Sequence, residues 1–200
     1  MTLENERGDW VETFSGLRFY ALDPRENEIS IIDIAHSQSL MCRFNGQSKF
    51  FYSIASHSIV VKKLLEYMNA PLIVQLQGLL HDASEAYICD IPTPIKGALT
   101  NYHDIEAKIM DVIFKKYNIP NRWNHNFLVK KCDYLSLLLE ANILMPNHTG
   151  WADRDTAISD NLWNYGNGLI MDRLGKKHDE TETEFLEIFN TLSVSLMNGR

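Results

Sequence analysis

The sequence predicts an all-α fold built as a single domain. Apolar residues recur every three to four positions over most of the chain, and Pro, Gly and Asn separate the long periodic segments. Strand-like alternation is confined to the N-terminal part. Two hundred residues suffice for one domain with a sizeable core. We therefore expect a helical bundle in which residues 1–30 form an N-terminal flap, 31–145 the core and 146–200 C-terminal helices.

The expected flap contains two strand-like runs. Residues 17–21 (Leu-Arg-Phe-Tyr-Ala) alternate in polarity, and the turn formers Asp23-Pro24 follow them. A second run, Ile29 to Ile34, is predicted to pair with the first. The polar and acidic residues 1–7 do not resemble a secretory signal.

Helical periodicity predicts six helices after the flap. Asn45-Gly46 ends the first, and Pro71 suits the first turn of the third, which is apolar nearly all round and is therefore expected at the centre. Two prolines make residues 90–94 extended or turning, and Pro146 to Gly168 is expected to be a loop with at most one helical turn. The predicted helices are Asp33–Phe44, Phe51–Met68, 71 to about Tyr87, Tyr102–Tyr117, Asn126–Met145 and Glu180–Met197.

Composition narrows the class of function. A net charge of −7 argues against a nucleic-acid binder, although a local basic cluster beside a metal ion can still bind a small anion. No apolar run approaches the roughly 20 residues that span a bilayer, so we expect a cytoplasmic protein without membrane contact. Three cysteines without C-x-x-C spacing indicate buried, reduced thiols rather than a disulfide framework.

A His-Asp pair inside an apolar segment is the most informative feature. His81-Asp82 lies in residues 78–87, where a buried carboxylate is costly without a partner, and a divalent cation could accept both side chains. His57 and Asp133 lie in two other apolar helical patterns, so four candidate ligands come from three helices, although His57 alone is usually a core histidine. Glu85, one helical turn after Asp82, is expected on the same face.

The order His57, His81-Asp82, Asp133 resembles the metal-binding signature of the HD superfamily of phosphohydrolases. Residues 81–85 followed by 90–96 resemble the bacterial 5′-deoxynucleotidases, and Arg43 matches an arginine that faces the substrate phosphate there. Cys89 and Phe44 depart from that family, which usually has Gly and Trp at these positions. Residues 33–53, with the flap upstream, are more similar to the phage branch, which includes dATP triphosphohydrolases.

The resemblance implies an HD-type bundle whose residues 31–145 form the catalytic core, with one divalent transition-metal ion (Co, Mn or Zn, with Mg as an alternative) as cofactor. It implies metal-assisted hydrolysis, in which a carboxylate orients the attacking water or protonates the leaving oxygen and a second one positions water or sugar. The candidate residues are His57, His81, Asp82 and Asp133 for the metal, Glu85 and Asp90 for catalysis, and Arg43, Lys96 and Phe44 for the substrate.

Several alternatives stay open. A dATP triphosphohydrolase, releasing deoxyadenosine and triphosphate in the control of nucleotide pools, leads; a 5′-deoxynucleotidase acting on dNMPs comes second. A non-catalytic nucleotide sensor is the alternative of another class. The partners expected are the nucleotide and further copies of the chain, in the host cytoplasm if the protein belongs to a phage. His36 is more simply a structural histidine, and Trp151 with other aromatic residues could line a base pocket.

Overall fold

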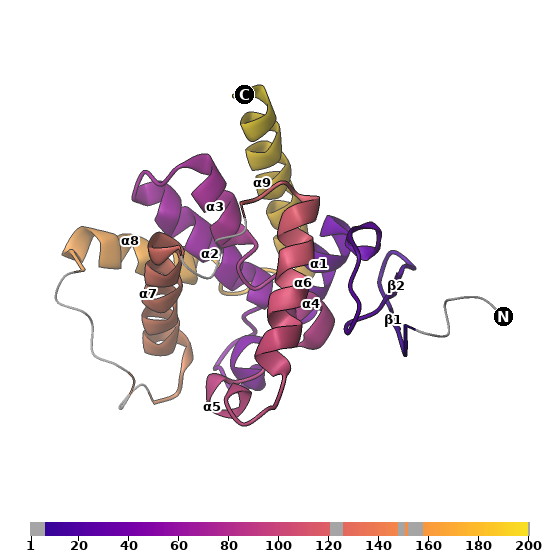
Figure 1. The fold of residues 1–200 in the computed structure, drawn as a ribbon. Coiled ribbons are helices and arrows are strands. Elements are labelled where there is room, and N and C mark those ends of the chain that lie inside the picture. Colours follow the sequence, from indigo (N-terminus) through magenta and orange to yellow (C-terminus); the bar gives the residue numbers. More distant parts are fainter. Residues whose placement is uncertain (1–6, 121–125, 148–150, 152–157, 200) are drawn as a thin grey trace.

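The computed structural model describes residues 7–120, 126–147, 151 and 158–199, and α-helices make up most of them (Figure 1). The predicted all-α class is confirmed. The helices are α1 (Ile31–Leu40), α2 (Ile54–Tyr67), α3 (Leu72–Leu79), α4 (Glu85–Ile88), α5 (Thr93–Lys96), α6 (Tyr102–Lys116), α7 (Phe127–Leu144), α8 (Asp160–Met171) and α9 (His178–Asn198).

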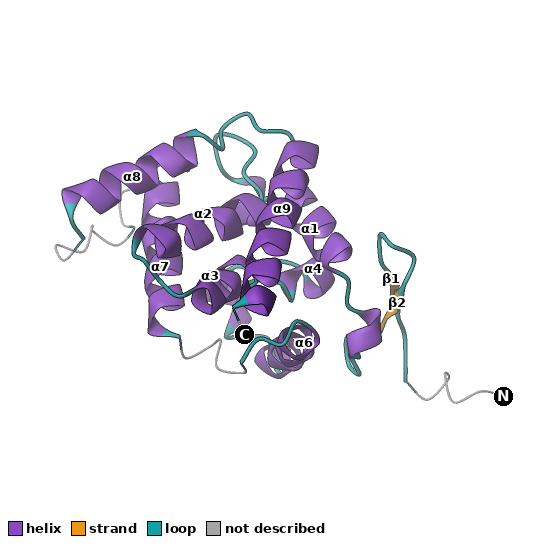
Figure 2. Cartoon of the chain, turned by 90° about the horizontal axis from the view of Figure 1, so that it is seen from above, coloured by secondary structure: helices purple, strands orange, loops and turns teal. Residues whose placement is uncertain are grey.

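Helix α2 lies at the centre of the bundle and contacts α1, α3, α7, α8 and α9 (Figures 1 and 2). One part of the core joins α1, α3, α6 and α9 around Phe114 and Phe185, and another packs α2 against α7 and α8 around Leu139. Helices α2 and α3 approach closely at Gly78, where a Cβ atom would lie 2.2 Å from Leu65 Cδ1. This approach brings the end of α3 beside α2, where two of the predicted ligands meet.

The predicted pairing of the run Ile29 to Ile34 with residues 17–21 is wrong. Strand β2 (Arg18–Phe19) pairs antiparallel with β1 (Val11–Glu12), and the hairpin lies at the N-terminal side of the bundle (Figure 2). The Ser30 hydroxyl accepts a hydrogen bond from the Ile32 amide at 3.2 Å and starts α1 one residue later. Within α1, Ile34 is buried and Ile32 is exposed, whereas strand alternation would put both side chains on one face.

The first predicted helix is shorter than expected. Helix α1 ends at Leu40, and residues 43–46 form a separate 3-10 turn in which Phe44 and Asn45 have φ values of 55° and 50°. A left-handed backbone conformation is costly for a residue with a bulky side chain. Phe44 has this conformation and lines the cavity that is described below. In the proline-rich segment, α5 makes a single turn with Pro94 near its start, as the missing amide of proline permits.

Two further bounds differ from the prediction. The helix expected over 71 to about Tyr87 is broken between α3 and α4, so His81 and Asp82 lie in turns rather than in a continuous helix. The expected loop of residues 146–168 contains most of α8, whose start is capped by Ser159 and whose Gly166 packs against Leu139. Frequent Gly and Asn hid this helix, because tertiary packing can override weak propensity. Residues 148–150 and 152–157 of the expected loop lie outside the described part.

A part-buried ion-pair network links α9 to α2 and to the segment that follows α8. Glu184 on α9 accepts hydrogen bonds from Arg173, from Lys63 on α2 at 2.8 Å and from Lys176 at 2.7 Å.

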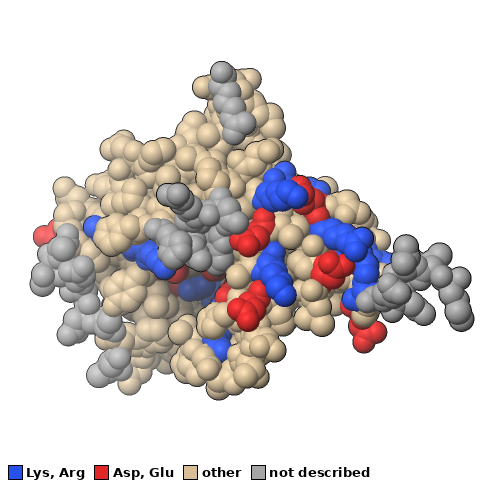
Figure 3. All heavy atoms as spheres, in the orientation of Figure 1, with Lys and Arg blue, Asp and Glu red and all other residues tan. Residues whose placement is uncertain are grey.

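On the face shown in Figure 3, acidic and basic side chains are intermixed over the region of α6. Among the described helices, none combines the length and apolar character needed to cross a bilayer.

Candidate metal centre

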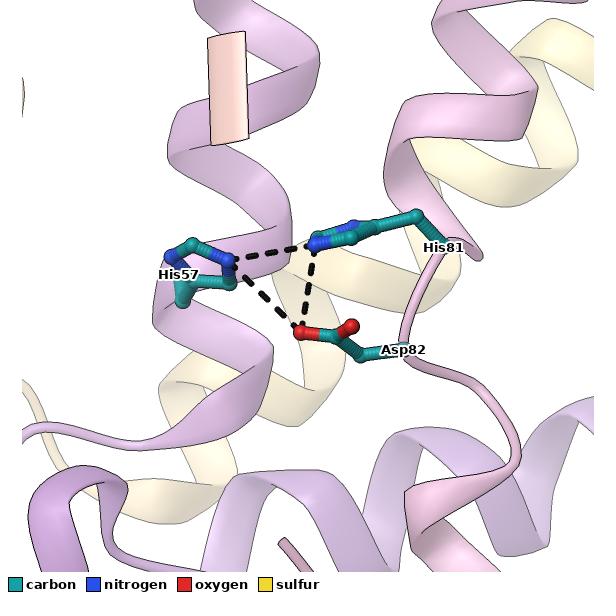
Figure 4. Close-up of side chains that lie close together, drawn as sticks. All are labelled: His57, His81 and Asp82. Atoms are coloured by element: carbon teal, nitrogen blue, oxygen red, sulfur yellow. Dashed lines mark hydrogen bonds and ion pairs between the residues drawn. The ribbon is translucent and has the colours of Figure 1, made fainter. Parts of the chain in front are cut away.

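Three predicted ligands from two elements meet in the bundle core. His57 lies in the second turn of α2, and His81 and Asp82 directly follow α3; their side chains point toward one another (Figure 4). The His57 and His81 Nε2 atoms are 3.2 Å apart, and Asp82 Oδ2 lies 3.6 Å and 3.1 Å from them. Asp133 Oδ1, on α7, approaches the same two nitrogens at 3.1 Å and 3.6 Å.

Second hydrogen bonds fix the orientation of both imidazoles. His81 Nδ1 is 2.8 Å from the Gly78 carbonyl oxygen, and His57 Nδ1 is 2.7 Å from a carboxylate oxygen of Glu140. These oxygens accept, so each Nδ1 carries a proton, and in the neutral rings each Nε2 presents a lone pair. Two lone pairs that face each other at 3.2 Å repel unless positive charge lies between them. A histidine that donates from Nδ1 and offers Nε2 is the usual arrangement of a metal ligand.

The electrostatics of the group also favour positive charge. Burial lowers the pKa of His81, but Asp82 and Asp133 outweigh this effect and raise the pKa well above its usual value. Burial opposes ionisation of Asp82, whereas His81 and His57 lower its pKa to about 2. Asp133 likewise has a pKa well below its usual value, because its bonds to His57 and His81 overcome the effect of burial.

The donor set fits a divalent transition metal. Bonds of about 2.1 Å to tetrahedral donors place those donors about 3.4 Å apart, and the separations of 3.1–3.6 Å among His57, His81 and Asp82 bracket this value. Imidazole and carboxylate donors suit first-row metals better than calcium. His57, His81 and Asp82 therefore form a group able to hold such an ion, with Asp133 in reach of both imidazoles.

Glu140 is a site residue that the sequence analysis missed. Its carboxylate is fully buried on α7 and contacts His57 Nδ1, the Ser136 hydroxyl at 2.9 Å and Arg43 Nε at 2.9 Å. One signal could have revealed it: Glu140 is an isolated acid in an apolar run, two helical turns after Asp133. That spacing puts both carboxylates on one helix face.

A cavity of about 500 Å³ opens beside the metal-ligand group. It is lined by the predicted ligands Asp82 and Asp133 and by every residue predicted for catalysis or substrate binding, namely Arg43, Phe44, Glu85, Asp90 and Lys96. Phe44 and Trp151 meet edge to face in its wall, with ring centroids 5.8 Å apart. Ligand pockets commonly have volumes of about 300–1,000 Å³, so a nucleotide-sized molecule is of suitable size.

The two predicted catalytic carboxylates, Glu85 and Asp90, lie in environments that raise their pKa values. Burial raises the pKa of Glu85 well above its usual value, with help from Asp82 and Asp90 and against the effect of Lys96. Within the described part of the chain, Glu85 Oε2 is buried without a hydrogen-bond partner. Burial also raises the pKa of Asp90, and the positive charge of Arg43 partly offsets this increase.

The two predicted phosphate-binding cations already have partners. Lys96 Nζ lies 3.4 Å from Glu85 and 3.1 Å from Glu106. The guanidinium of Arg43 does not lie at the surface, because only 12% of its side chain is exposed and Glu140 accepts a hydrogen bond from its Nε. Both side chains line the cavity while they hold a carboxylate of the site.

Other candidate residues lie elsewhere. His36 stacks on Phe14 and binds Glu182 of α9 at 3.0 Å, which matches its structural interpretation. The aromatic residues Phe50 and Phe51, which follow the 3-10 turn, are exposed and lie outside the cavity lining, so they do not belong to a base pocket there. Cys132 is buried, whereas Cys42 and Cys89 are exposed, so the expectation of buried thiols holds for Cys132 alone.

Comparison with known proteins relates the chain to two bacterial proteins. It is 32% identical over 152 residues to the uncharacterized protein RCAP_rcc00048 of Rhodobacter capsulatus, an alignment that covers 72% of this chain and 78% of that protein. The chain belongs to the RCAP_rcc00048 family. It is also 41% identical over 111 residues to the uncharacterized protein YfdR of Escherichia coli K12, covering 56% of this chain and spanning 60% of YfdR. No family model matches the chain.

Proposed function

We propose that this member of the RCAP_rcc00048 family is an HD-superfamily hydrolase that cleaves a deoxynucleotide phosphate with one divalent transition-metal ion. The observation that carries the proposal is the convergence of His57 and His81, both with Nε2 turned toward the same point, on Asp82 and Asp133. A cavity of suitable size adjoins this group. The order of these ligands along the chain is the order that resembles the HD signature.

The ion would be held by His57, His81, Asp82 and Asp133. When bound, it supplies Lewis-acid activation of water and of a phosphoryl oxygen. The fully buried His57 and the largely buried His81 have little freedom to turn, because each ring is also held at Nδ1. The chain therefore presents preformed donors rather than assembling them around the ion.

Glu85 is the proposed proton carrier. Its raised pKa keeps the carboxyl protonated more readily than an exposed glutamate, and Oε2 has no competing partner among the described residues. A proton on Oε2 can pass to the leaving oxygen of the ester. Lys96 holds the other oxygen, Oε1, and so orients the carboxyl group. Asp90, in the same lining, would orient water or sugar.

The substrate would lie between charged and apolar walls. Arg43 and Lys96 are the cations available to phosphate oxygens in the described lining. On the apolar side, Phe44 and Trp151, with Leu137, offer ring faces and aliphatic surface to a base. This division of the cavity suits a molecule with one anionic end and one aromatic end, as a nucleotide has.

The two candidate activities, dATP triphosphohydrolase and 5′-deoxynucleotidase, differ in the number of phosphates on the substrate. The similarity of residues 33–53 to the phage branch favours a dATP triphosphohydrolase. One observation favours the 5′-deoxynucleotidase instead: in the described lining, the carboxylates of Asp82, Asp90 and Asp133 face only two cations, while Glu85 carries the proton. With a divalent ion the net charge is about +1, so a dianionic monophosphate matches it more closely than a triphosphate, which carries more negative charge.

A product assay separates these activities. The purified chain is incubated with Co²⁺, Mn²⁺, Zn²⁺ or Mg²⁺ and each dNTP and dNMP, and the products are resolved by chromatography. Deoxyadenosine with intact triphosphate establishes the first activity, and orthophosphate from monophosphates establishes the second. Tight nucleotide binding without turnover by the metal-loaded chain would refute both and identify a sensor.

Variants test the assigned roles. His81→Ala or Asp82→Ala should abolish bound metal and turnover together, and a fully active variant would remove the basis of the proposal. Glu85→Gln should keep the metal while lowering kcat by about 100-fold or more. Glu106→Gln is the matched control, since Glu106 also binds Lys96 but does not line the cavity. Equal rates for these two variants would exclude Glu85 as the proton carrier.

A further inference from the structure

We infer that Glu140 is a positioning residue that couples the metal ligand His57 to Arg43, so that one connected set of side chains holds both the ion and the substrate phosphate. The inference rests on the function proposed above and adds a residue to its machinery. Glu140 does not line the cavity. It would act through the two side chains that it binds.

The hydrogen bonds of Glu140 all go to the site. Oε1 accepts from His57 Nδ1 at 2.7 Å and from the Ser136 hydroxyl at 2.9 Å, while Oε2 accepts from Arg43 Nε at 2.9 Å. Glu140 and Ser136 are both fully buried. A carboxylate removed from water is costly unless it is paired and hydrogen-bonded, and these partners meet both requirements. The Glu140 carboxylate is therefore held rigidly between His57 on α2 and Arg43 in the turn that precedes α2.

The bond to His57 governs how that ring faces the ion. Rotation of the imidazole would break the contacts of Nδ1 with Glu140 and with Ser136, which lies 3.3 Å from the same nitrogen. An outer carboxylate of this kind fixes the tautomer of a ligand histidine and strengthens it as a donor. Glu140 thus keeps Nε2 of His57 directed at His81 and Asp133.

The bond to Arg43 extends the connection to the substrate side. With Nε on Glu140, the guanidinium places Nη1 3.9 Å from Oδ2 of the ligand Asp82, so it lies between the buried carboxylate and the metal-ligand group. Arg43 also lines the cavity. Any shift of Glu140 therefore moves a metal ligand and a phosphate-binding group together.

A simpler role for Glu140 would be to neutralise the buried charge of Arg43. That role predicts a loss of stability on Glu140→Gln without a loss of metal affinity. Coupling predicts a different result, since the amide of glutamine replaces one of the two accepting oxygens by an NH2 group, which donates and so faces the donor of His57 or of Arg43. The two roles are therefore separated by metal affinity rather than by stability.

The test is a Co²⁺ titration of the full chain, followed by the visible absorption of the bound ion. Glu140→Gln should weaken Co²⁺ binding by about 10- to 100-fold and change the absorption bands. The control is Glu184→Gln, which removes a carboxylate from a part-buried ion-pair network outside the cavity lining and should leave affinity and bands unchanged. Wild-type affinity with unchanged bands in Glu140→Gln would overturn the inference.

A double-mutant cycle tests the coupling itself. Arg43→Ala should change the Co²⁺ affinity by factors that differ at least about threefold between the wild-type and the Glu140→Gln backgrounds. Equal effects in both backgrounds would refute the connection through Glu140. If Glu140→Gln does not fold, Ser136→Ala replaces it: an affinity loss of up to about tenfold supports the inference, and wild-type affinity refutes it. A wild-type chain that binds no Co²⁺ would instead refute the metal centre proposed above.

Discussion

Replacement of Cys89 by glycine should stabilise the protein. Cys89 has φ 68° and ψ 157°, a backbone region that is essentially restricted to glycine and costs other residues about 1–3 kcal/mol. Glycine adds an entropic cost of about 0.5–1 kcal/mol, because it loses more freedom on folding. The cysteine side chain is exposed, so its removal forfeits little burial. The balance predicts that Cys89→Gly raises the free energy of unfolding by about 1 kcal/mol.

Urea and thermal unfolding measure this change. For a chain of this size, 1 kcal/mol corresponds to a Tm increase of about 2–4 °C. Cys89→Ala is the matched control, because it removes the thiol but keeps the Cβ atom that causes the strain; its stability should stay within about 0.5 kcal/mol of wild type. The carbonyl of Cys89, which accepts a bond from the Tyr102 hydroxyl at 3.2 Å, is present in both variants. If Cys89→Gly is no more stable than Cys89→Ala, the argument from backbone strain is wrong.

Three other predictions follow from the packing and the charges. Gly78→Ala should lower the free energy of unfolding by about 1 kcal/mol, because overpacking against the buried Leu65 outweighs the gain in helix propensity; Gly168→Ala, with open space around its Cβ position, should instead raise it in the same urea titration. Glu184→Gln should cost about 2 kcal/mol near pH 7. Burial opposes its ionisation, but three cations hold its pKa below the usual 4.5, so the carboxylate stabilises the fold above that pH and loses this effect as pH falls. Unfolding curves of wild type and Glu184→Gln should therefore converge in acid, and a constant gap would contradict this. Phe44→Ala should raise KM for the nucleotide about tenfold with a smaller change in kcat, because a stacking contact holds substrate and transition state alike; an unchanged KM would remove Phe44 from the base pocket.

The fold class and the candidate ligands could be predicted because both depend on local features. Helical periodicity is visible within one turn or two, so most helices were found within a few residues of their bounds. His57, His81, Asp82 and Asp133 were identified because a chemically costly side chain stands out in an apolar helical pattern, and the structure brings these four side chains together. Their meeting is itself a contact between distant segments, and it was expected from the resemblance of their order along the chain rather than from local features.

The partners of Glu140, the helix α8 and the pairing of the N-terminal hairpin could not be predicted in the same way. Glu140 is 83 residues from His57 and 97 from Arg43, so its role exists only once α2 and α7 have packed. The sequence by itself determined a helical chain that carries His57, His81, Asp82 and Asp133 as candidate metal donors. The tertiary structure alone decided that Arg43 binds a buried carboxylate and that Phe44 accepts left-handed backbone in the cavity wall. The physical reason is that burial and hydrogen-bond pairing are properties of contacts between distant segments, which local propensity does not encode.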